Sequence, residues 1–381
     1  MMKRKSSIRR RAASLVSSQA VRLSQGSGAI FADLSMLTAV VLVALGTVTA
    51  HAQQSQALEG ETGFVYTADE YGNSISAVDL ATGRVETVPV AISPHNIQAT
   101  ADGARLLVVG NPATDSAMQG HSGAGHESEI EGQLLVFDPR NLSSGPLVSI
   151  PVGEHPAHVV VDREGRHAFV TLSGQNAVAV VDLARNEILR TIETGRYPHG
   201  LRISPDGRVI YVANVKDGSV SVVDTAGLVE VARIPVGEAP VQVGFTPDGS
   251  HVYVSLRDEY KVAVIDTGTR KVVARIAVGR NPIQVHVTPD GRFVYVANQG
   301  TEAEPADTVS VIDVAAGTVV DTIRTGEGAH GVAVSDDGRY VFVTNIAAGT
   351  VSAIEAATRT VTGTFKVGRG PNGITFRSGV H

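Results

Sequence analysis

Short apolar runs separated by polar turns recur along the chain from about residue 62 to its end. One stretch contains four such runs: VIYVAN (209–214), SVSVVD (219–224), VEVARIPVG (229–237) and PVQVGFTPDG (240–249). Runs of β-branched residues bounded by Gly, Asp and Asn turns are typical of antiparallel strands. No segment keeps an apolar period of 3.6 residues. The pattern therefore predicts units of four strands and almost no helix.

The four-strand unit repeats with a nearly constant length. Its turn sequences (ADG, REG, PDG or DDG) end at Gly103, Gly165, Gly207, Gly249, Gly291 and Gly338. The spacings between these glycines are 62, 42, 42, 42 and 47 residues, and Gly379 follows 41 residues later. Counting 42 residues back from the first glycine reaches residue 61. Seven repeats thus fill the chain and predict a seven-bladed β-propeller, which closes on itself.

The two ends of the repeat region complement each other. The first repeat begins directly at GFVYTAD (63–69), without an innermost strand before it, whereas PNGITFRSG (371–379) is an innermost strand with no repeat after it. We therefore predict an all-β fold of seven blades with four antiparallel strands each. The C-terminal strand completes the N-terminal blade. The chain has no cysteine, so this closure uses no disulfide.

At the level of the repeat, the sequence resembles a known family. The motif YVAN…SVSVVD…VEVARIPVG…P…TPDG, with FVTN (342–345) in the last repeat, resembles the YVTN-type β-propeller repeat. The resemblance covers about residues 62–381 and implies the propeller fold. It implies no single function, because its consensus consists of strand and turn residues. Related propellers include lactonases and lyases, but none of their motifs can be matched here position by position.

The first 52 residues differ in composition from the repeats. Seven basic residues precede the apolar stretch LTAVVLVALGTVTA (37–50), and AHA follows, ending at Ala52. This order is that of a secretory signal peptide. About 14 apolar residues are too few for a mature anchor, which needs roughly 20, although an uncleaved anchor is the alternative. We expect a signal peptide at 1–52, a propeller at 53–381, and a periplasmic or secreted protein without a membrane span in the mature chain.

Removal of this leader makes the protein more acidic. The whole chain has 32 basic and 38 acidic residues, and the leader contains seven of the former and one of the latter, Asp33. The mature chain then has 25 basic and 37 acidic residues, a net charge of −12 instead of −6. Because nucleic-acid binding depends largely on Lys and Arg, nucleic acid is disfavoured as a partner, and we expect a monomer that binds a small ligand, a metal or a protein.

Histidines recur where each repeat leads into its innermost strand. In a propeller these connections, from the fourth strand of one blade (strand D) to the first of the next (strand A), meet at the mouth of the central channel. Four of the connections contain a histidine one or two positions beyond the proline, or beyond Ala329 in its place: His95, His158, His199 and His330. Gln242, Gln284 and Asn372 stand there in the other three. Converging imidazoles can bind a transition metal such as copper or zinc. Alternatively, each imidazole bonds to backbone groups of the next blade.

Two insertions interrupt the repeat on the same predicted face. Residues 111–132 lengthen the loop between the second and third strands (B and C) of one blade, and residues 299–307 add five residues at the equivalent place in another. The first insertion contains Met118, His121 and His126, and thioether with imidazole favours copper. It could fold over the channel mouth or supply metal ligands. It could equally be a solvated loop, since long loops are tolerated.

These observations leave several functions open. We expect an exported, non-catalytic propeller that binds a ligand or partner at the channel-mouth face, with a transition metal among the candidates. The alternative is a metal-assisted hydrolase or lyase of the lactonase type at the same mouth, and a protein–protein scaffold is a third. The sequence has no G-x-S-x-G, H-E-x-x-H or P-loop motif. The Asp residues that end most third strands are expected to form turns, so no catalytic residue is assigned.

Overall fold

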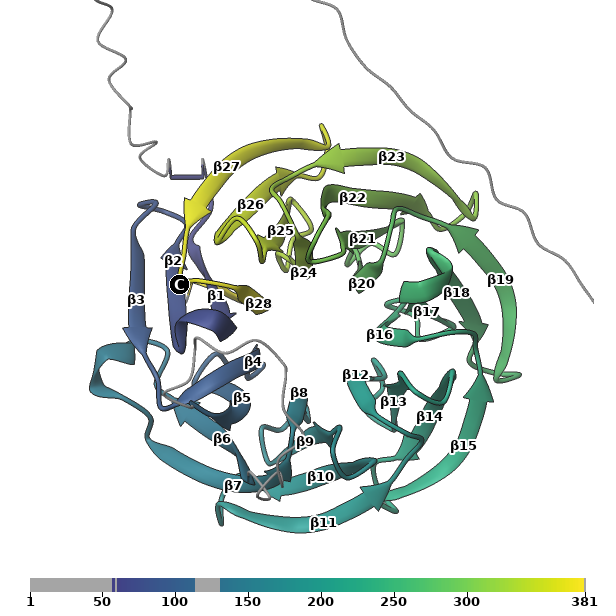
Figure 1. The fold of residues 1–381 in the computed structure, drawn as a ribbon, viewed down its shortest axis with the longest axis horizontal. Coiled ribbons are helices and arrows are strands. Elements are labelled where there is room, and N and C mark those ends of the chain that lie inside the picture. Colours follow the sequence, from purple (N-terminus) through teal and green to yellow (C-terminus); the bar gives the residue numbers. More distant parts are fainter. Residues whose placement is uncertain (1–56, 59, 114–130, 380–381) are drawn as a thin grey trace, which may run out of the picture. The chain divides into compact units, whose positions relative to one another are not determined.

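The computed structural model describes residues 57–58, 60–113 and 131–379. Its strands form seven antiparallel sheets of four strands, which follow one another around a ring (Figure 1). The predicted fold class is therefore confirmed. The described residues contain no α-helix, only the three short 3-10 turns η1 (Glu70–Gly72), η2 (Leu142–Ser144) and η3 (Arg257–Glu259). None of their helices is long and apolar enough to cross a membrane.

Each blade runs from an inner strand at the ring centre to an outer strand at the rim. The first blade consists of β28 (Pro371–Ser378), β1 (Gly63–Asp69), β2 (Ser74–Asp79) and β3 (Val85–Pro89). The next three are β4 (Ile92–Ala99), β5 (Leu106–Pro112), β6 (Glu131–Phe137), β7 (Val148–Glu154); β8 (Pro156–Val161), β9 (His167–Leu172), β10 (Ala177–Asp182), β11 (Glu187–Glu193); and β12 (Pro198–Ile203), β13 (Val209–Asn214), β14 (Ser219–Asp224), β15 (Val229–Pro235). The last three are β16 (Pro240–Phe245), β17 (His251–Leu256), β18 (Lys261–Asp266), β19 (Lys271–Ala277); β20 (Pro282–Val287), β21 (Phe293–Gly300), β22 (Pro305–Asp313), β23 (Thr318–Arg324); and β24 (Ala329–Val334), β25 (Tyr340–Asn345), β26 (Thr350–Glu355), β27 (Thr360–Lys366).

The ring closes through strands from opposite ends of the repeat region. Strand β28 pairs antiparallel with β1, from Gly63 opposite Ser378 to Thr67 opposite Ile374. This pairing confirms the predicted completion of the N-terminal blade by the C-terminal strand. Closure leaves no inner edge unpaired in the first blade, which is how propellers avoid exposed sheet edges.

The hydrophobic core lies between neighbouring blades. Each cluster of buried residues draws on two adjacent sheets; one, for example, joins Phe169 and Val178 of the third blade to Leu201 and Val212 of the fourth. The alternating side chains of every inner and middle strand therefore pack against the blades on both sides. The outer strands are more exposed, as β11 illustrates with only one buried residue, Ile192. Blade-to-blade burial of this kind is the main favourable term holding the ring together.

Polar side chains stabilise the turns at both ends of the blades. The Asp that ends a third strand accepts a hydrogen bond from a turn amide, as Asp182 does from Ala184 N at 2.9 Å. This confirms the predicted turn role of these carboxylates. At the other end, the last Asn of the YVAN-type strands is buried, and its amide group donates to two hydroxyls of the next strand. For Asn345 these are Thr350 and Ser352, both at 2.9 Å.

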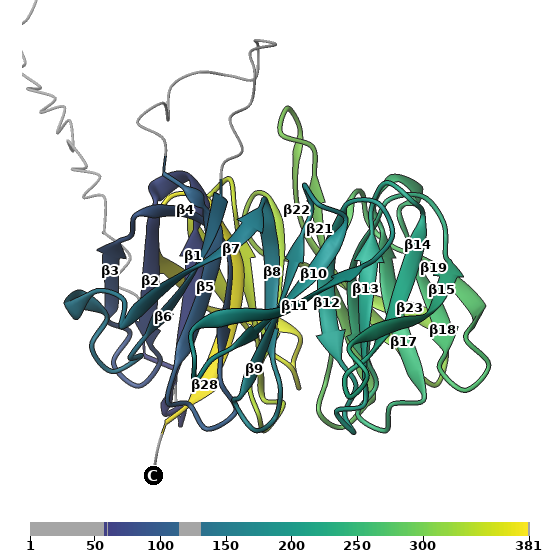
Figure 2. The ribbon, with the colours of Figure 1, turned by 90° about the horizontal axis from the view of Figure 1, so that it is seen from below.

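The second insertion is an extension of a hairpin. Strands β21 and β22 are longer than their counterparts and meet in a tight turn in which Thr301 N donates to Glu304 O at 3.1 Å. The hairpin rises above its neighbours on one face of the ring (Figure 2). The first insertion joins β5 to β6 on this same side of the blades, and its central residues 114–130 lie outside the described part of the chain.

Candidate metal centre

Each connection into an inner strand has the same backbone shape. The residue before the proline, or before its replacement Ala329, has a positive φ in six of the seven blades: His155, Tyr197, Ala239, Asn281, Gly328 and Gly370. The register then shifts after the proline; for example, Pro198 faces Asn214 but Leu201 faces Val212. Such a bulge places one extra residue in the strand and changes the direction of its side chains. The bulge allows the first or the second residue after the proline to face the axis.

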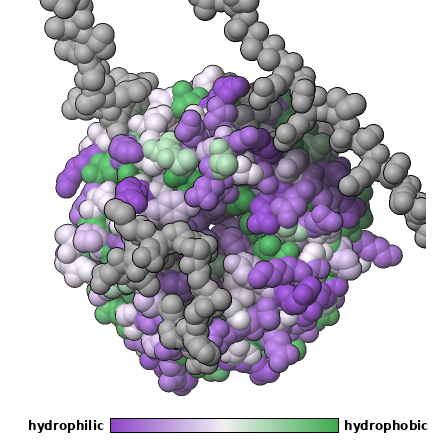
Figure 3. Space-filling model, viewed as in Figure 1, coloured by the Kyte–Doolittle hydropathy of each residue, from purple (hydrophilic) through white to green (hydrophobic). Residues whose placement is uncertain are grey.

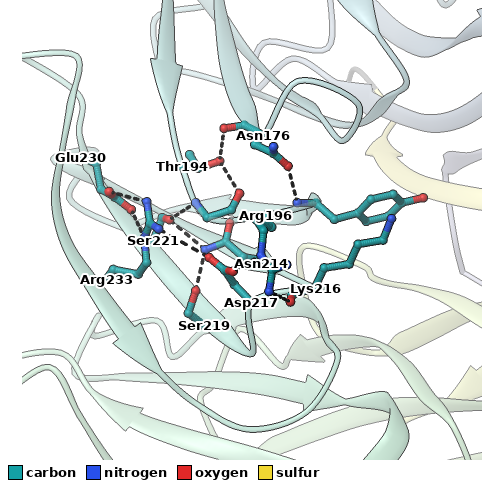
Figure 4. A network of polar contacts seen from close by, with 12 residues as sticks. Asn176, Thr194, Arg196, Asn214, Lys216, Asp217, Ser219, Ser221, Glu230 and Arg233 are labelled. Atoms are coloured by element: carbon teal, nitrogen blue, oxygen red, sulfur yellow. Dashed lines mark hydrogen bonds and ion pairs between the residues drawn. The ribbon is translucent and has the colours of Figure 1, made fainter.

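The connection that leads to His199 shows how these residues are held (Figure 4). Asn176 Oδ1 accepts the Tyr197 N–H at 2.9 Å. Arg196 donates to Asp217 Oδ1 at 2.7 Å and to Lys216 O at 2.9 Å. Residues of two neighbouring blades therefore form hydrogen bonds with the segment just before His199 and hold it in place. A ligand placed on an inner strand and braced in this way has little freedom to move away from the axis.

Three histidines converge at the axis from three consecutive inner strands. His95 comes from β4, His158 from β8 and His199 from β12, and one ring nitrogen of each lies within 4.8 Å of those of the others. The closest pair is Nε2 of His95 and Nε2 of His199, 3.1 Å apart. Two nitrogen ligands of a tetrahedral metal lie about 3.3 Å apart when each bond is about 2.05 Å. The pair thus already has the spacing of two metal ligands.

The partners of the two Nδ1 atoms determine what the facing Nε2 atoms of this pair can do. Nδ1 of His199 lies 3.3 Å from the carbonyl oxygen of Val241, which can only accept, so Nδ1 has the proton. Nδ1 of His95 lies 3.3 Å from Glu70 Oε1, and an ionised carboxylate likewise only accepts. In the tautomer of His95 that donates from Nδ1 to Glu70, both Nε2 atoms present lone pairs to each other, and a cation between them satisfies both. In the other tautomer, Nδ1 accepts from Asn372 Nδ2 and Nε2–H donates to His199 Nε2.

His158 completes the cluster and has no other hydrogen-bonding role. Its side chain is fully buried at 0% exposure, and neither ring nitrogen has a hydrogen-bond partner. Its ring centre lies 4.8 Å from that of His199 and 5.7 Å from that of His95. Buried polar atoms are nearly always bonded, so both ring nitrogens of His158 are available to bind a further group. The donor set, three imidazoles, suits copper or zinc.

A carboxylate and an amide support the cluster from behind. Asn372 Nδ2 donates to Glu70 Oε2 at 2.6 Å and also lies 3.2 Å from His95 Nδ1. Burial alone would raise the pKa of Glu70, but the charge of His95 and the hydrogen bonds from His95 and Asn372 outweigh it and lower that pKa to about 2. A carboxylate behind the distal nitrogen of a ligating histidine is the usual outer shell of a metal site.

The burial of the imidazoles keeps them in the form that binds metals. Burial, together with the nearby His95, lowers the pKa of His199 to about 3. The same two causes, with the charge of His199 added, lower the pKa of His158 well below its ordinary value. Both rings are therefore neutral at physiological pH, and neutral imidazole is the ligand form.

The remaining predicted ligands stand apart from this group. His330 is on β24, and burial together with the charge of His95 lowers its pKa to about 4. Its Nδ1 bonds Asn372 O at 3.3 Å, and the ring is not one of the three clustered ones. The backbone bonds of His199 and His330 to the next blade agree with the alternative role predicted for such histidines. These backbone hydrogen bonds use only Nδ1 of each ring, so Nε2 takes no part in them. Met118, His121 and His126 lie outside the described residues.

The sequence pattern did not single out Glu70. It follows β1 in a B-to-C turn and reaches a histidine of the next blade, which agrees with the prediction that these turns share a face with the D-to-A connections. A carboxylate directly after a second strand, beside a histidine-bearing connection, is the signal that could have identified it. The space-filling view down the ring axis shows a hollow at the centre, where the inner strands meet (Figure 3).

Two family models match parts of the chain. Residues 148–291 match that of the YNCE-like β-propeller, and residues 288–365 match that of the cytochrome D1 heme domain. The first match covers less than half of the chain; with the seven sheets, it supports the predicted class, a β-propeller built of repeats. The second match covers only the sixth and seventh blades and includes none of the three clustered histidines. No curated protein matches the chain.

Several solved structures have a similar fold. Hydrazine synthase of Kuenenia stuttgartiensis superposes with a TM-score of 0.62 at 21% identity, over 74% of this chain and 89% of that one. A functionally unknown protein from Desulfotomaculum acetoxidans DSM 771 has a TM-score of 0.67 at 16% identity, over 83% and 99%. A putative 6-phosphogluconolactonase from Bacteroides uniformis ATCC 8492 has a TM-score of 0.66 at 17% identity, over 83% and 100%. At these identities the likeness is one of fold.

Proposed function

We propose that this propeller binds one transition-metal ion, copper or zinc, at the channel mouth through His95, His158 and His199. The observation that supports this most strongly is the fully buried His158, whose two ring nitrogens have no partner although two other imidazoles face it. Three imidazoles leave a fourth coordination position for a ligand from the channel. In this proposal the protein binds its ligand through the metal, and no residue is assigned a catalytic role.

A titration of metal-free protein tests this proposal. Cu²⁺ and Zn²⁺, each in competition with a chelator of known affinity, are expected to bind wild-type protein one to one, and nitrogen couplings in the Cu²⁺ electron paramagnetic resonance spectrum should report the imidazoles. His95→Ala/His199→Ala should weaken binding more than 100-fold, since a single site loses two of its three ligands. His251→Ala serves as the control. His251 is the first residue of β17, the second strand of its blade, and lies at the other end of the blades, next to Ser250.

The outcome separates the channel site from the inserted loop. Equal affinity in wild-type protein and the double variant would overturn the proposal. A loss of affinity in His121→Ala/His126→Ala, with the channel histidines intact, would add the inserted loop to the same site. The three channel imidazoles remain the core of the proposal, since their geometry supports it without the loop.

Replacement of the supporting carboxylate is expected to weaken metal binding without abolishing it. Glu70→Gln keeps the size of the side chain but removes the charge that holds His95 Nδ1–H, and such outer-shell changes lower metal affinity by about 10- to 100-fold. Glu238→Gln is the matched control, because Glu238 is an exposed carboxylate of a D-to-A connection. The same competition titration measures both variants, and equal affinities would argue against the role of Glu70.

We favour binding over catalysis. A hydrolase or lyase of the lactonase type would use the same three nitrogens with a metal-bound water in the fourth position. The likeness to a putative lactonase is at 17% identity and therefore extends to the fold alone. Activity against lactones in the metal-loaded protein, lost in the double variant, would favour the enzyme instead.

We also propose that the protein is exported. The support is the order of basic residues, the apolar stretch 37–50 and the small residues that end at Ala52. An exported protein meets copper and zinc outside the cytoplasm, where thiol ligands that compete for them are scarce. N-terminal sequencing of protein recovered from cells is expected to begin near Gln53, and a start at residue 1 or 2 would contradict this.

A further inference from the structure

An arginine stands on an innermost strand, farther from the channel mouth than the histidines. Arg202 is on β12, three residues after His199, which at about 3.3 Å per residue places it roughly 10 Å deeper along the strand. Its charge lowers the pKa of His158 on β8 and of His286 on β20. Around the ring the inner strands follow in the order β8, β12, β16 and β20, so β12 and β16 lie between the two histidine strands. Arg202 stands on the innermost strand of its blade, at the same position, four residues after the proline, that His286 has on β20.

This guanidinium has little to satisfy it within the protein. Its Nη1 donates to Leu201 O at 3.0 Å, and no carboxylate of the described residues forms an ion pair with it. Burial, which disfavours the charged form, lowers the pKa of Arg202 to about 10, so it stays charged at physiological pH. Arg202 is half-buried, a guanidinium has five N–H donors, and a partly desolvated charge without a counter-ion is unfavourable.

The surroundings of Arg202 contain no negative charge to balance it. His286 stands at the same position of its strand, four residues after the proline, and its pKa is lowered to about 4 by burial and by Arg202, so it is neutral. The corresponding residues of the other inner strands are uncharged: Gln98, Val160, Gly244, Ala333 and Thr375. This level of the channel therefore has a positive potential, and Glu70 at the mouth is already bonded to His95 and Asn372.

We propose that the channel binds a small oxyanion, a carboxylate or phosphate group, on Arg202. The planar fork of a guanidinium matches the two oxygens of such a group and forms two parallel charge-assisted hydrogen bonds with it. The bound group supplies the missing counter-ion. His286 Nδ1 bonds Val332 O at 3.2 Å, which leaves its Nε2 as an acceptor for a hydroxyl on the same ligand. The site needs no metal, so it is independent of the function proposed above.

Calorimetric titration of metal-free protein with phosphate and with succinate, at pH 7.5 and constant ionic strength, tests the site. At least one of the two should bind one to one and raise the melting temperature. Arg202→Gln is expected to weaken this binding at least tenfold. Arg208→Gln is the control, because that side chain lies in the same blade and is 85% exposed. Phosphate and succinate arms distinguish the two kinds of oxyanion.

The anion-free proteins give a second readout. Removal of an unpaired, half-buried charge should raise the melting temperature of Arg202→Gln above that of wild-type protein, whereas a purely structural arginine would lower it. If Arg202→Gln does not fold, Arg202→Lys replaces it; the loss of the planar fork should again weaken binding, while Arg208→Lys should not. Identical responses of wild-type protein and the folded variant to both anions, or equal competition by chloride, would overturn the proposal.

Discussion

Metal-free protein with the substitution His158→Leu is expected to be more stable than wild-type protein and unable to bind the metal tightly. His158 is fully buried, and neither ring nitrogen has a hydrogen-bond partner. A buried polar atom without a partner costs about 1–3 kcal/mol. Leucine has a similar volume and removes both such atoms, so the free energy of unfolding should rise by about 1–3 kcal/mol. Metal affinity should fall more than 100-fold, because one of three ligands is lost.

Urea unfolding of the metal-free proteins and a competition titration measure the two effects. His286→Leu is the matched control, because that imidazole is also in the channel but donates from Nδ1 to Val332 O. Its removal leaves a carbonyl without a donor, so the control should not gain stability and should retain its metal affinity. Opposite signs for stability and binding at one residue are typical of functional sites. A stable, metal-binding His158→Leu protein would show that the imidazole is not a ligand.

The second large effect concerns the blade that closes the ring. Asp69 occupies the position at which three other blades have a buried Asn, and it is 0% exposed. Ser76 donates to Oδ2 at 2.6 Å and Thr67 to Oδ1 at 2.7 Å. Burial raises the pKa of Asp69 to about 6, although these hydrogen bonds act in the other direction. At neutral pH the blade therefore contains a buried charge that the other blades avoid.

The pKa of Asp69 determines the sign of the pH dependence. The folded-state pKa of about 6 is above the unfolded value of about 3.8, so the native state binds the extra proton between these pH values. Stability from this group is fully present below pH 3.8 and is lost as the pH rises through 6. We expect Asp69→Asn to remove this dependence. Relative to wild-type protein, the variant should gain roughly 2–3 kcal/mol between pH 4 and pH 7.

Denaturant unfolding at several pH values measures this gain. Asn345→Asp provides the converse variant, because Asn345 donates to Thr350 and Ser352 as an Asn at position 69 would donate to Ser74 and Ser76. Asn345→Asp should be less stable than wild-type protein at neutral pH. Its stability relative to wild-type protein should fall as the pH rises, whereas that of Asp69→Asn should increase. A constant difference between Asp69→Asn and wild-type protein across this pH range would contradict the assignment.

The architecture could be predicted because its signals are local and repeated. The run VIYVAN is strand β13, GFVYTAD is β1, and the turn glycines recur every 42 residues where no insertion intervenes. A unit that cannot bury its apolar faces alone must stack on its neighbours, so the number of repeats also determines the number of blades. The missing first strand and the additional last one then predicted the closure of β28 on β1.

The site was predicted in part. The sequence placed four histidines in the D-to-A connections, but their positions relative to the proline differ: His199 is one residue after it and His158 is two. Whether both face the axis depends on the bulge after the proline, and nothing in a strand pattern reports that shift of register. The distance between rings on consecutive blades depends in turn on how closely the inner strands approach.

By itself, the sequence determined the seven blades, their strands, the closure of the ring and the face on which the histidines stand, because each follows from a pattern within about 42 residues. Only the tertiary structure decided which side chains meet. Glu70 contacts His95 and Asn372, which are 25 and 302 residues away in the chain. It also separated the three clustered imidazoles from His330. Residues of different blades become neighbours only when the ring closes, since the axis is shared by all seven repeats and belongs to none of them.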